Sequence, residues 1–318
     1  MKNTLKNLNV WLTPHQQGVL NRLTEENPIL DSIPVRAASH GIYNVYADTT
    51  EITGMSEVDF DEELPTVGVS FELGRTRLGK IGGKLPIPQD AATEVGGYSA
   101  YANARMPSII AKSGNDHEYR LYYKGFLKAA IDNGKAVSVG GSTANKQFSL
   151  VAVTYDMDST VGLYNPKATS VGMGRGVIFE ELVLNGGNVS EIEVGGKKCL
   201  GKIIAAYMQF GLQLADPRLV GALVNIQPAQ NGTDRDKIDG LPTAAQMDDL
   251  LAGVRAGANT VIYCHPTIAQ KMASKFQLTQ RRIANGDTSV RYAMYDWQGV
   301  PVITSYNIGW GNEAVVSL

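Results

Sequence analysis

The most informative segment of this 318-residue chain covers residues 57–84 and reads EVDFDEELPTVGVSFELGRTRLGKIGGK. Its beginning is acidic and its end is basic, and between them residues 66–73 are rich in β-branched and apolar residues, which is typical of a strand. The acidic residues are Glu57, Asp59, Asp61, Glu62 and Glu63, and the basic residues are Arg75, Arg77, Lys80 and Lys84. Because little in this stretch could form a core of its own, we predict that residues 48–86 leave the body as a long β-arm.

A β-arm of this kind needs a partner. Its strands present unpaired backbone edges, which promote aggregation unless something covers them. The opposite charge of its two halves suits docking against complementary patches on neighbouring molecules. A hairpin folded back onto its own body is the alternative, and it stays open at this point. On physical grounds, the segment favours a protein that assembles with copies of itself.

The composition excludes several classes of protein. A chain of 34.2 kDa is one large domain or two modest ones, and 43% hydrophobic residues is ordinary for a globular protein. Lys and Arg number 29 against 31 Asp and Glu, which argues against sequence-specific DNA binding. Two distant cysteines, Cys199 and Cys264, exclude a disulfide scaffold. With no signal peptide and no run of about 20 apolar residues, we expect no membrane association.

Two helical regions are expected in the first half of the chain. Thr13-Pro14 has the pattern of a helix start, and Asn27-Pro28 would end that helix. Residues 88–134 are expected to be mainly helical, with interruptions at Gly96-Gly97 and Pro107.

The second half predicts strands, followed by an alternation of helix and strand. Residues 148–226 contain apolar segments joined by glycine turns, and 220–226 fit either a helix end or a strand. Thr243 and Gln246 form a capping-box pattern that starts a helix, with Gly257 as its terminating glycine. Strands are also expected at 260–264, 299–303 and 313–316, with a helix from Pro266. The whole is α+β, with one body and one protruding arm.

Motifs for cofactor binding are weak. Residues 74–81 (GRTRLGKI) and 196–203 (GKKCLGKI) have the glycine spacing and the lysine of a phosphate-binding loop. Both have Ile where Ser or Thr would hold magnesium, and neither has a clear strand before it and a helix after it, so we favour glycine-rich turns with surface lysines. Residues 172–176 (GMGRG) lack the glycine spacing of a dinucleotide loop.

Acidic and nucleophilic residues give no better site. Asp156 and Asp158 form a DxD pattern, which metal-dependent transferases use but which a turn after a strand also explains. Cys264 and His265 are neighbours at a predicted strand, so their side chains point to opposite faces and cannot easily chelate one ion. The aspartates at 234, 236 and 239, before Gly240, lack the Glu that closes a calcium loop. We therefore predict no catalytic residue, no metal and no cofactor.

A series of short segments follows one another in a characteristic order. They are VGLYNPK (161–167), FGLQLADPR (210–218), VNI (224–226), TVIYCHP (260–266), GVPVI (299–303) and NEAVV (312–316). In this order they resemble the major capsid proteins of tailed bacteriophages of the Hong Kong 97 type. Each segment alone is loose, but together the elements cover the chain from about residue 12 onward.

The resemblance implies an α+β capsid fold with an N-terminal arm, an extended β-hairpin loop (E-loop), a peripheral domain with a spine helix, and an axial domain. The parts would be 1–47 for the N-terminal arm and its lead-in, 48–86 for the extended loop, 87–219 for the peripheral domain, about 220–298 for the axial domain and 299–318 for closing strands that return to the body.

The resemblance also implies a function. Copies would assemble as hexamers and pentamers into the icosahedral shell of a virion around double-stranded DNA, after assembly in the bacterial host cytoplasm. The charged residues of the arm would form ion pairs between subunits, and contact with DNA would be weak and non-specific. Because the chain begins almost at the arm, we expect a separate scaffolding protein, a portal and, as an optional addition, a decoration protein. Lys80 and Lys84 lie in the expected arm, but no covalent crosslink is predicted.

Two other functions stay open. Bacterial encapsulins share the fold but enclose cargo enzymes, and neighbouring genes would distinguish them. An enzyme that uses the DxD pattern or the Gly-Lys loops would instead be a discrete monomer that binds a metal or a nucleotide.

Overall fold

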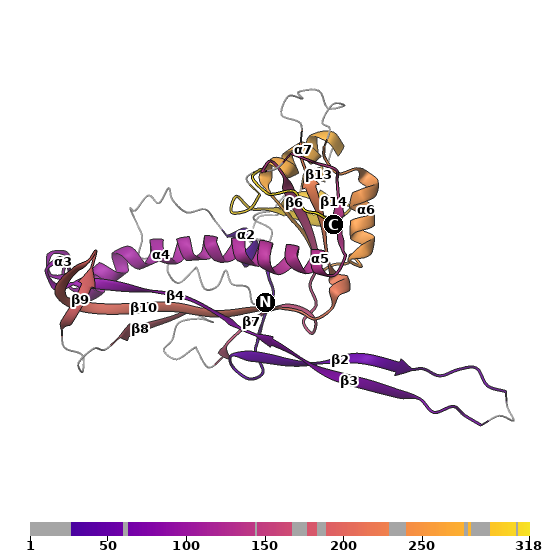
Figure 1. Ribbon diagram of the computed structural model, residues 1–318, viewed down its shortest axis with the longest axis horizontal. Helices are drawn as coiled ribbons and strands as arrows, with labels where there is room; N and C mark the ends of the chain where they lie inside the picture. Colours follow the sequence, from indigo (N-terminus) through magenta and orange to yellow (C-terminus); the bar gives the residue numbers. More distant parts are fainter. Residues whose placement is uncertain are drawn as a thin grey trace.

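The computed structural model describes residues 27–59, 63–143, 145–166, 177–182, 189–228, 240–276, 279–280, 293–309 and 311–318. The helix predicted from residue 13, the GMGRG segment and the aspartates at 234, 236 and 239 lie outside these ranges. Figure 1 shows a compact body at one end of a long helix, a sheet of long strands along that helix, and a two-stranded arm that projects from the molecule. No helix in the described part is long and apolar enough to cross a membrane.

A mixed seven-stranded sheet forms the centre of the compact body. In spatial order its strands are β13 (Thr279–Gln280), β14 (Ala293–Trp297), β15 (Val300–Thr304), β12 (Thr260–Cys264), β6 (Phe148–Thr154), β11 (Val220–Ile226) and β5 (Ala136–Ser138). The pairings of β12 with β15 and of β11 with β5 are parallel, and the others are antiparallel. The segment 220–226, for which helix and strand were both open, is therefore a strand.

Both faces of this sheet are buried. Helices α6 (Ala244–Gly253) and α7 (Pro266–Phe276) belong to the cluster on one face, and the long helix belongs to the cluster on the other. On β6, Leu150 and Ala152 face α6 and α7, whereas Val151 and Val153 face the long helix. This explains why β6 is a continuous apolar run without the polar alternation of a half-exposed strand.

A second, six-stranded sheet is organised by one long strand, β10 (Lys197–Leu214), which pairs antiparallel with four others along its length. The other strands are β1 (Val35–Ala37), β4 (Gly79–Pro88), β7 (Thr160–Tyr164), β8 (Val177–Leu182) and β9 (Ser190–Val194). Gly195 and Gly196 have φ values of 60° and 80° and form the turn between β9 and β10. The predicted glycine turn is present there because only glycine adopts this conformation without strain.

The long helix joins the two sheets. It consists of α4 (Tyr98–Arg120), a π-helical segment η2 (Leu121–Leu127) and α5 (Lys128–Asp132), and α3 (Gln89–Val95) precedes it. Gly96 and Gly97, with φ values of 92° and 115°, separate α3 from α4, as predicted. The interruption predicted at Pro107 is wrong, since the helix continues through it. Met106 and Ile110 pack against the six-stranded sheet on either side of Pro107, and this packing offsets the lost backbone hydrogen bond.

Pro28 begins the short helix α2 (Pro28–Ser32), and the helix predicted to end before it lies outside the described residues. Two other local predictions fail for identifiable reasons. The left-handed position after α6 is taken by Arg255, with φ of 53°, and Gly257 is not in that conformation. Residues 313–316 form no strand beyond one bridge at Glu313. The end of the chain is held instead by a side chain, because Asn225 bonds both the backbone N–H and the carbonyl of Val316, each at 2.8 Å.

Candidate functional site on the two-stranded arm

The arm is a separate sheet of two antiparallel strands, β2 (Tyr43–Thr53) and β3 (Gly68–Arg77). Neither strand pairs with another sheet among the described residues, and Figure 1 shows both projecting away from the body. The hairpin is therefore not folded back onto its own subunit. Its bounds also differ from the expected 48–86, because β2 begins at Tyr43 and the sheet ends at Arg77.

The arm has one apolar and one acidic face. Directly opposed residues of an antiparallel pair lie on the same face, and the register joins Ala47 to Leu73, Thr49 to Phe71 and Ile52 to Val69. The large apolar side chains on this face are exposed to solvent: Ile52 by 69%, Val69 by 51%, Phe71 by 65% and Leu73 by 73%. On the opposite face, Asp48 is paired with Glu72, and Glu51 with Ser70.

A β-bulge near Thr50 keeps the two faces distinct. The register shifts between Thr49 and Glu51, so that one extra residue is inserted into β2, and the Thr50 hydroxyl donates a hydrogen bond to the Ser70 carbonyl at 3.3 Å. Side chains alternate between faces along a strand, and an inserted residue reverses this alternation. Without the bulge, Glu51 would lie on the apolar face and Ile52 on the acidic face.

This apolar face was not predicted from the sequence. The available signal is the alternation V-G-V-S-F-E-L at 67–73, in which every second residue is apolar. The contribution of β2 could not be read in the same way, because the bulge breaks its alternation.

The root of the arm is fixed by buried contacts. Leu78, directly after β3, packs in a small cluster with Ala38, Val161 and Leu163. On β2, Asn44 is 2% exposed, and its Nδ2 donates a hydrogen bond to Oε1 of Gln213 on β10 at 2.6 Å. Asn44 Oδ1 accepts the backbone N–H of Ser39 at 3.0 Å, and Gln213 donates to the Asp158 carbonyl at 2.7 Å.

The charged residues proposed for subunit contacts fall into three places. Glu57, Asp59 and Glu63 lie in the connection between β2 and β3, whereas Asp61 and Glu62 lie outside the described residues. Arg75 and Arg77 lie on β3, towards its body end. The placement of the lysines in the arm is wrong, because Lys80 and Lys84 lie on β4, which pairs with β10 in the six-stranded sheet. The chain changes sheets at Leu78 without a turn, so the sequence has no signal at this boundary.

All the described members of this set are exposed, and none forms an ion pair with another described residue: Glu57, Asp59, Glu63, Arg75, Arg77, Lys80 and Lys84. Two of them stack on aromatic rings. The Arg75 guanidinium lies 3.9 Å from the centre of the Tyr43 ring, and the Lys80 ammonium lies 3.8 Å from that of Tyr207. The charges of these residues are thus available to a second molecule.

The weak cofactor motifs have structural explanations. Residues 74–81 run from β3 into β4, and 196–203 run from a turn into β10, so neither has the helix that a phosphate-binding loop requires. Asp156 accepts hydrogen bonds from the N–H and hydroxyl of Ser159 in a tight turn after β6. Cys264 is fully buried, and burial raises the pKa of its thiol to about 12. No group of residues in the described part could hold a metal ion.

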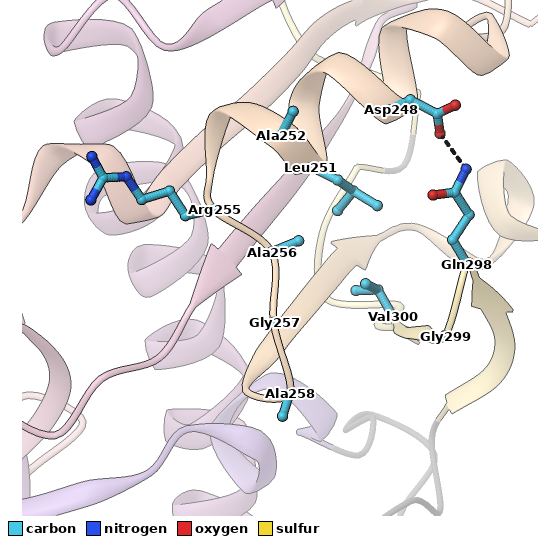
Figure 2. Close-up of a pocket in the computed structure, with 10 residues that line it drawn as sticks. All are labelled: Asp248, Leu251, Ala252, Arg255, Ala256, Gly257, Ala258, Gln298, Gly299 and Val300. Atoms are coloured by element: carbon cyan, nitrogen blue, oxygen red, sulfur yellow. Dashed lines mark hydrogen bonds between the residues drawn. The ribbon is translucent and has the colours of Figure 1, made fainter.

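A shallow pocket lies between the end of α6 and the turn from β14 to β15 (Figure 2). Its carboxylate, Asp248, accepts hydrogen bonds from Trp297 Nε1 at 3.0 Å and Gln298 Nε2 at 2.8 Å. Figure 2 shows the Arg255 side chain extending away from the other lining residues. The pocket thus offers a substrate no convergent set of reactive groups.

Comparisons with known proteins bear on the fold. No family model and no curated protein matches the sequence. A chain of bacteriophage epsilon15 is similar in structure, with a TM-score of 0.54 at 12% identity over 100% of this chain and 98% of that chain. The capsid of bacteriophage JBD30 has a TM-score of 0.54 at 11% identity over 92% of this chain and 94% of that chain. The SrpI encapsulin of Synechococcus elongatus PCC 7942 has a TM-score of 0.48 at 10% identity over 69% of this chain and 94% of that chain. From the likeness to the two phage chains over nearly their full length, we conclude that this chain has the α+β fold of tailed-bacteriophage capsid proteins.

Proposed function

We propose that this chain is the major capsid protein of a tailed double-stranded DNA bacteriophage. Copies assemble as hexamers and pentamers into an icosahedral shell that encloses the genome, and the chain is structural and not an enzyme. It resides in the virion after assembly in the bacterial cytoplasm. The observation that carries the proposal is the exposed apolar face of the arm, which the described residues of its own subunit leave uncovered, on a fold shared with phage capsid chains.

In this proposal the arm docks onto the next subunit through its apolar face. Burying a side chain such as Phe71 or Leu73 contributes about 1.5–3 kcal/mol, whereas an ion pair at the rim of an interface contributes about 0–1 kcal/mol. Apolar burial therefore supplies most of the affinity. The acidic residues Glu57, Asp59, Asp61, Glu62 and Glu63 and the basic residues Arg75, Arg77, Lys80 and Lys84 would set the register through ion pairs between subunits.

We also propose the assignment of regions and partners that the resemblance implies. Residues 87–219 would form the peripheral part of each capsomer, and residues 220–298 the part around its axis. A separate scaffolding protein, a portal and an optional decoration protein would be its partners. The near-neutral net charge of −2 supports only weak, non-specific contact with packaged DNA.

Electron microscopy and sedimentation of the protein, expressed alone and with its neighbouring genes, test the proposal. We expect closed shells or capsomer rings. A monodisperse monomer under every condition would overturn the proposal, and shells that enclose a cargo enzyme instead of DNA would replace it with an encapsulin.

Two matched double variants test the docking surface. Phe71→Gln with Leu73→Gln changes the apolar face, and Ser70→Gln with Glu72→Gln changes the opposite face of the same strand. We expect the first pair to abolish shells while the monomer stays folded, because both side chains are already exposed. The second pair should still assemble. Normal shells from the first pair would show that this face is not buried between subunits.

A further inference from the structure

Glu118 on α4 is a fully buried carboxylate at which three parts of the chain meet. Its Oε2 accepts the backbone N–H groups of Ile29 at 3.0 Å and Leu30 at 3.4 Å, both on α2. Its Oε1 accepts the Ser305 hydroxyl, in a short hydrogen bond, and Nδ2 of Asn307 at 3.1 Å. Glu118 thus joins the long helix to α2 and to the residues that follow β15.

Within the described part of the chain, no positive charge is paired with this carboxylate. Among the described residues, no Lys, Arg or His forms an ion pair with Glu118. Titratable groups on the surrounding elements include Asp31 on α2, Tyr263 and Cys264 on β12 and Tyr306 after β15. On α4 itself, Asp116, His117, Tyr119 and Arg120 are the nearest in sequence. Burial lowers the pKa of His117 to about 4, so that its ring is neutral at neutral pH. Tyr263 is engaged in hydrogen bonds with Ser32 and Tyr155.

The junction holds both ends of the described chain. Asn307 also donates a hydrogen bond to Asn27 at 3.2 Å, at the point where residues 1–26 join α2. Further along, the backbone N–H of Gly309 bonds to the Tyr123 hydroxyl at 2.7 Å, and the same hydroxyl donates to Glu313 at 2.6 Å. Glu118 is the residue of this set that contacts α2 and the segment after β15 at once.

We propose that Glu118 is a proton-dependent latch, which holds α2 and residues 305–307 on the long helix when it is protonated and favours their release when it is charged. The geometry supports this, since the carboxylate is enclosed in the closed junction and would reach water if α2 moved away. The latch is a property of the single subunit and does not depend on the proposed capsid function.

The direction of the pH effect follows from the environment. Burial raises the pKa of Glu118 from 4.5 to about 7, although its hydrogen bonds act in the opposite direction. A carboxyl group with a raised pKa stabilises the closed state fully below its ordinary pKa, and this contribution is lost as the pH rises through the raised value. Each pKa unit corresponds to a tenfold change in the opening equilibrium. We therefore expect opening to increase by about 100-fold from acidic to mildly alkaline pH.

Hydrogen exchange measured by mass spectrometry tests the latch in the full chain. After correction for intrinsic exchange, peptides that cover 27–33 and 304–309 should lose protection as the pH rises from about 5 to about 8.5, relative to a β6 peptide. Glu118→Gln should abolish this pH dependence. Glu94→Gln, an exposed control on α3, should retain it. Equal protection of both segments at the two pH values in the wild type would overturn the proposal, as would unchanged pH dependence in Glu118→Gln.

A second variant keeps the test decisive if Glu118→Gln does not fold. The Ser305 hydroxyl favours the charged form of Glu118, so Ser305→Ala should move the midpoint of the exchange transition to higher pH. A purely structural contact would lower protection at every pH and leave the midpoint where it was, and that result would contradict the latch.

Discussion

The side-chain amide of Asn44 donates a hydrogen bond at 2.6 Å to the side-chain carbonyl of Gln213, and the two residues are 2% and 0% exposed. This contact connects the beginning of β2 to the end of β10, the longest strand among the described residues. A buried hydrogen-bonded pair fixes the relative orientation of two strands more strongly than an apolar contact does, because donor and acceptor must meet at a set distance and angle. The orientation of the arm is thus specified inside the body.

Disrupting this pair should loosen the root of the arm. Asn44→Ala or Gln213→Ala leaves a buried polar group without its partner, which costs about 1–3 kcal/mol of the free energy of unfolding. The double variant should be less destabilised than the sum of the single variants, since it leaves neither partner orphaned. Urea unfolding of all four proteins measures this coupling, and strict additivity would mean that the pair does not act as a unit.

Reversing the charge of Arg75 and Arg77 together to Glu should stop shell formation and leave the subunit folded. Both side chains are exposed and form no ion pair with another described residue, and within the subunit Arg75 only stacks on the Tyr43 ring, so we expect the main effect on a contact with another molecule. Circular dichroism checks the fold, and sedimentation checks assembly. Lys135→Glu with Lys146→Glu, an exposed pair outside the arm, is the control and should assemble. Shells of normal yield from the arginine variant would remove these residues from the interface.

His117→Phe should make the protein more resistant to acid. Among the described residues, neither ring nitrogen of His117 has a hydrogen-bond partner, and its ring packs edge-on against Phe210 at 5.1 Å. Burial lowers its pKa from 6.5 to about 4, so the unfolded chain binds a proton more readily than the folded chain, and stability falls as the pH drops through this window.

At about pH 5, the His117→Phe variant should keep about 2 kcal/mol of the free energy of unfolding that the wild type loses on acidification. Urea unfolding near pH 7 and near pH 5 measures it. Burial lowers the pKa of His265 in the same direction, so part of the acid sensitivity should remain in the variant. An unchanged difference between the two pH values would show that His117 is not responsible.

Gly162→Val should destabilise the fold by about 1–3 kcal/mol through overpacking. A Cβ atom at Gly162 on β7 would lie 2.9 Å from the Phe210 ring and 3.0 Å from the Ile33 side chain, both of which are buried. Gly83→Val on β4 is the matched control, because a Cβ there meets nothing within 4 Å. Thermal unfolding compares the two, and equal melting temperatures would show that the space around Gly162 can relax.

Much of the fold could be predicted because local signals agreed with it. The capping box of Thr243 and Gln246 is present, and Met247, Leu250, Leu251 and Val254 are buried. Each of these features depends on residues within a few positions of one another, so tertiary packing has little opportunity to override them.

The failures arose where distant packing decides the outcome. The long helix continues through Pro107, where Met106 and Ile110 pack against the six-stranded sheet, and at Leu78 the chain changes sheets without a turn. The apolar face of the arm depends on a bulge whose position follows from the partner strand. In the sequence, Glu118 cannot be distinguished from a surface glutamate on a helix. It is buried only because α2 and residues 305–307, which are distant in sequence, pack against it.

The direct passage of β3 into β4 through Leu78 has a mechanical consequence. β4 pairs with β10 residue by residue, from Gly79 opposite Phe210 to Pro88 opposite Gly201. A force applied to the arm along its length reaches this ladder parallel to the strands and loads its hydrogen bonds simultaneously, in shear. A force across the strands would break the same bonds one after another. The arm is therefore a tether that is strong in extension and weak to peeling.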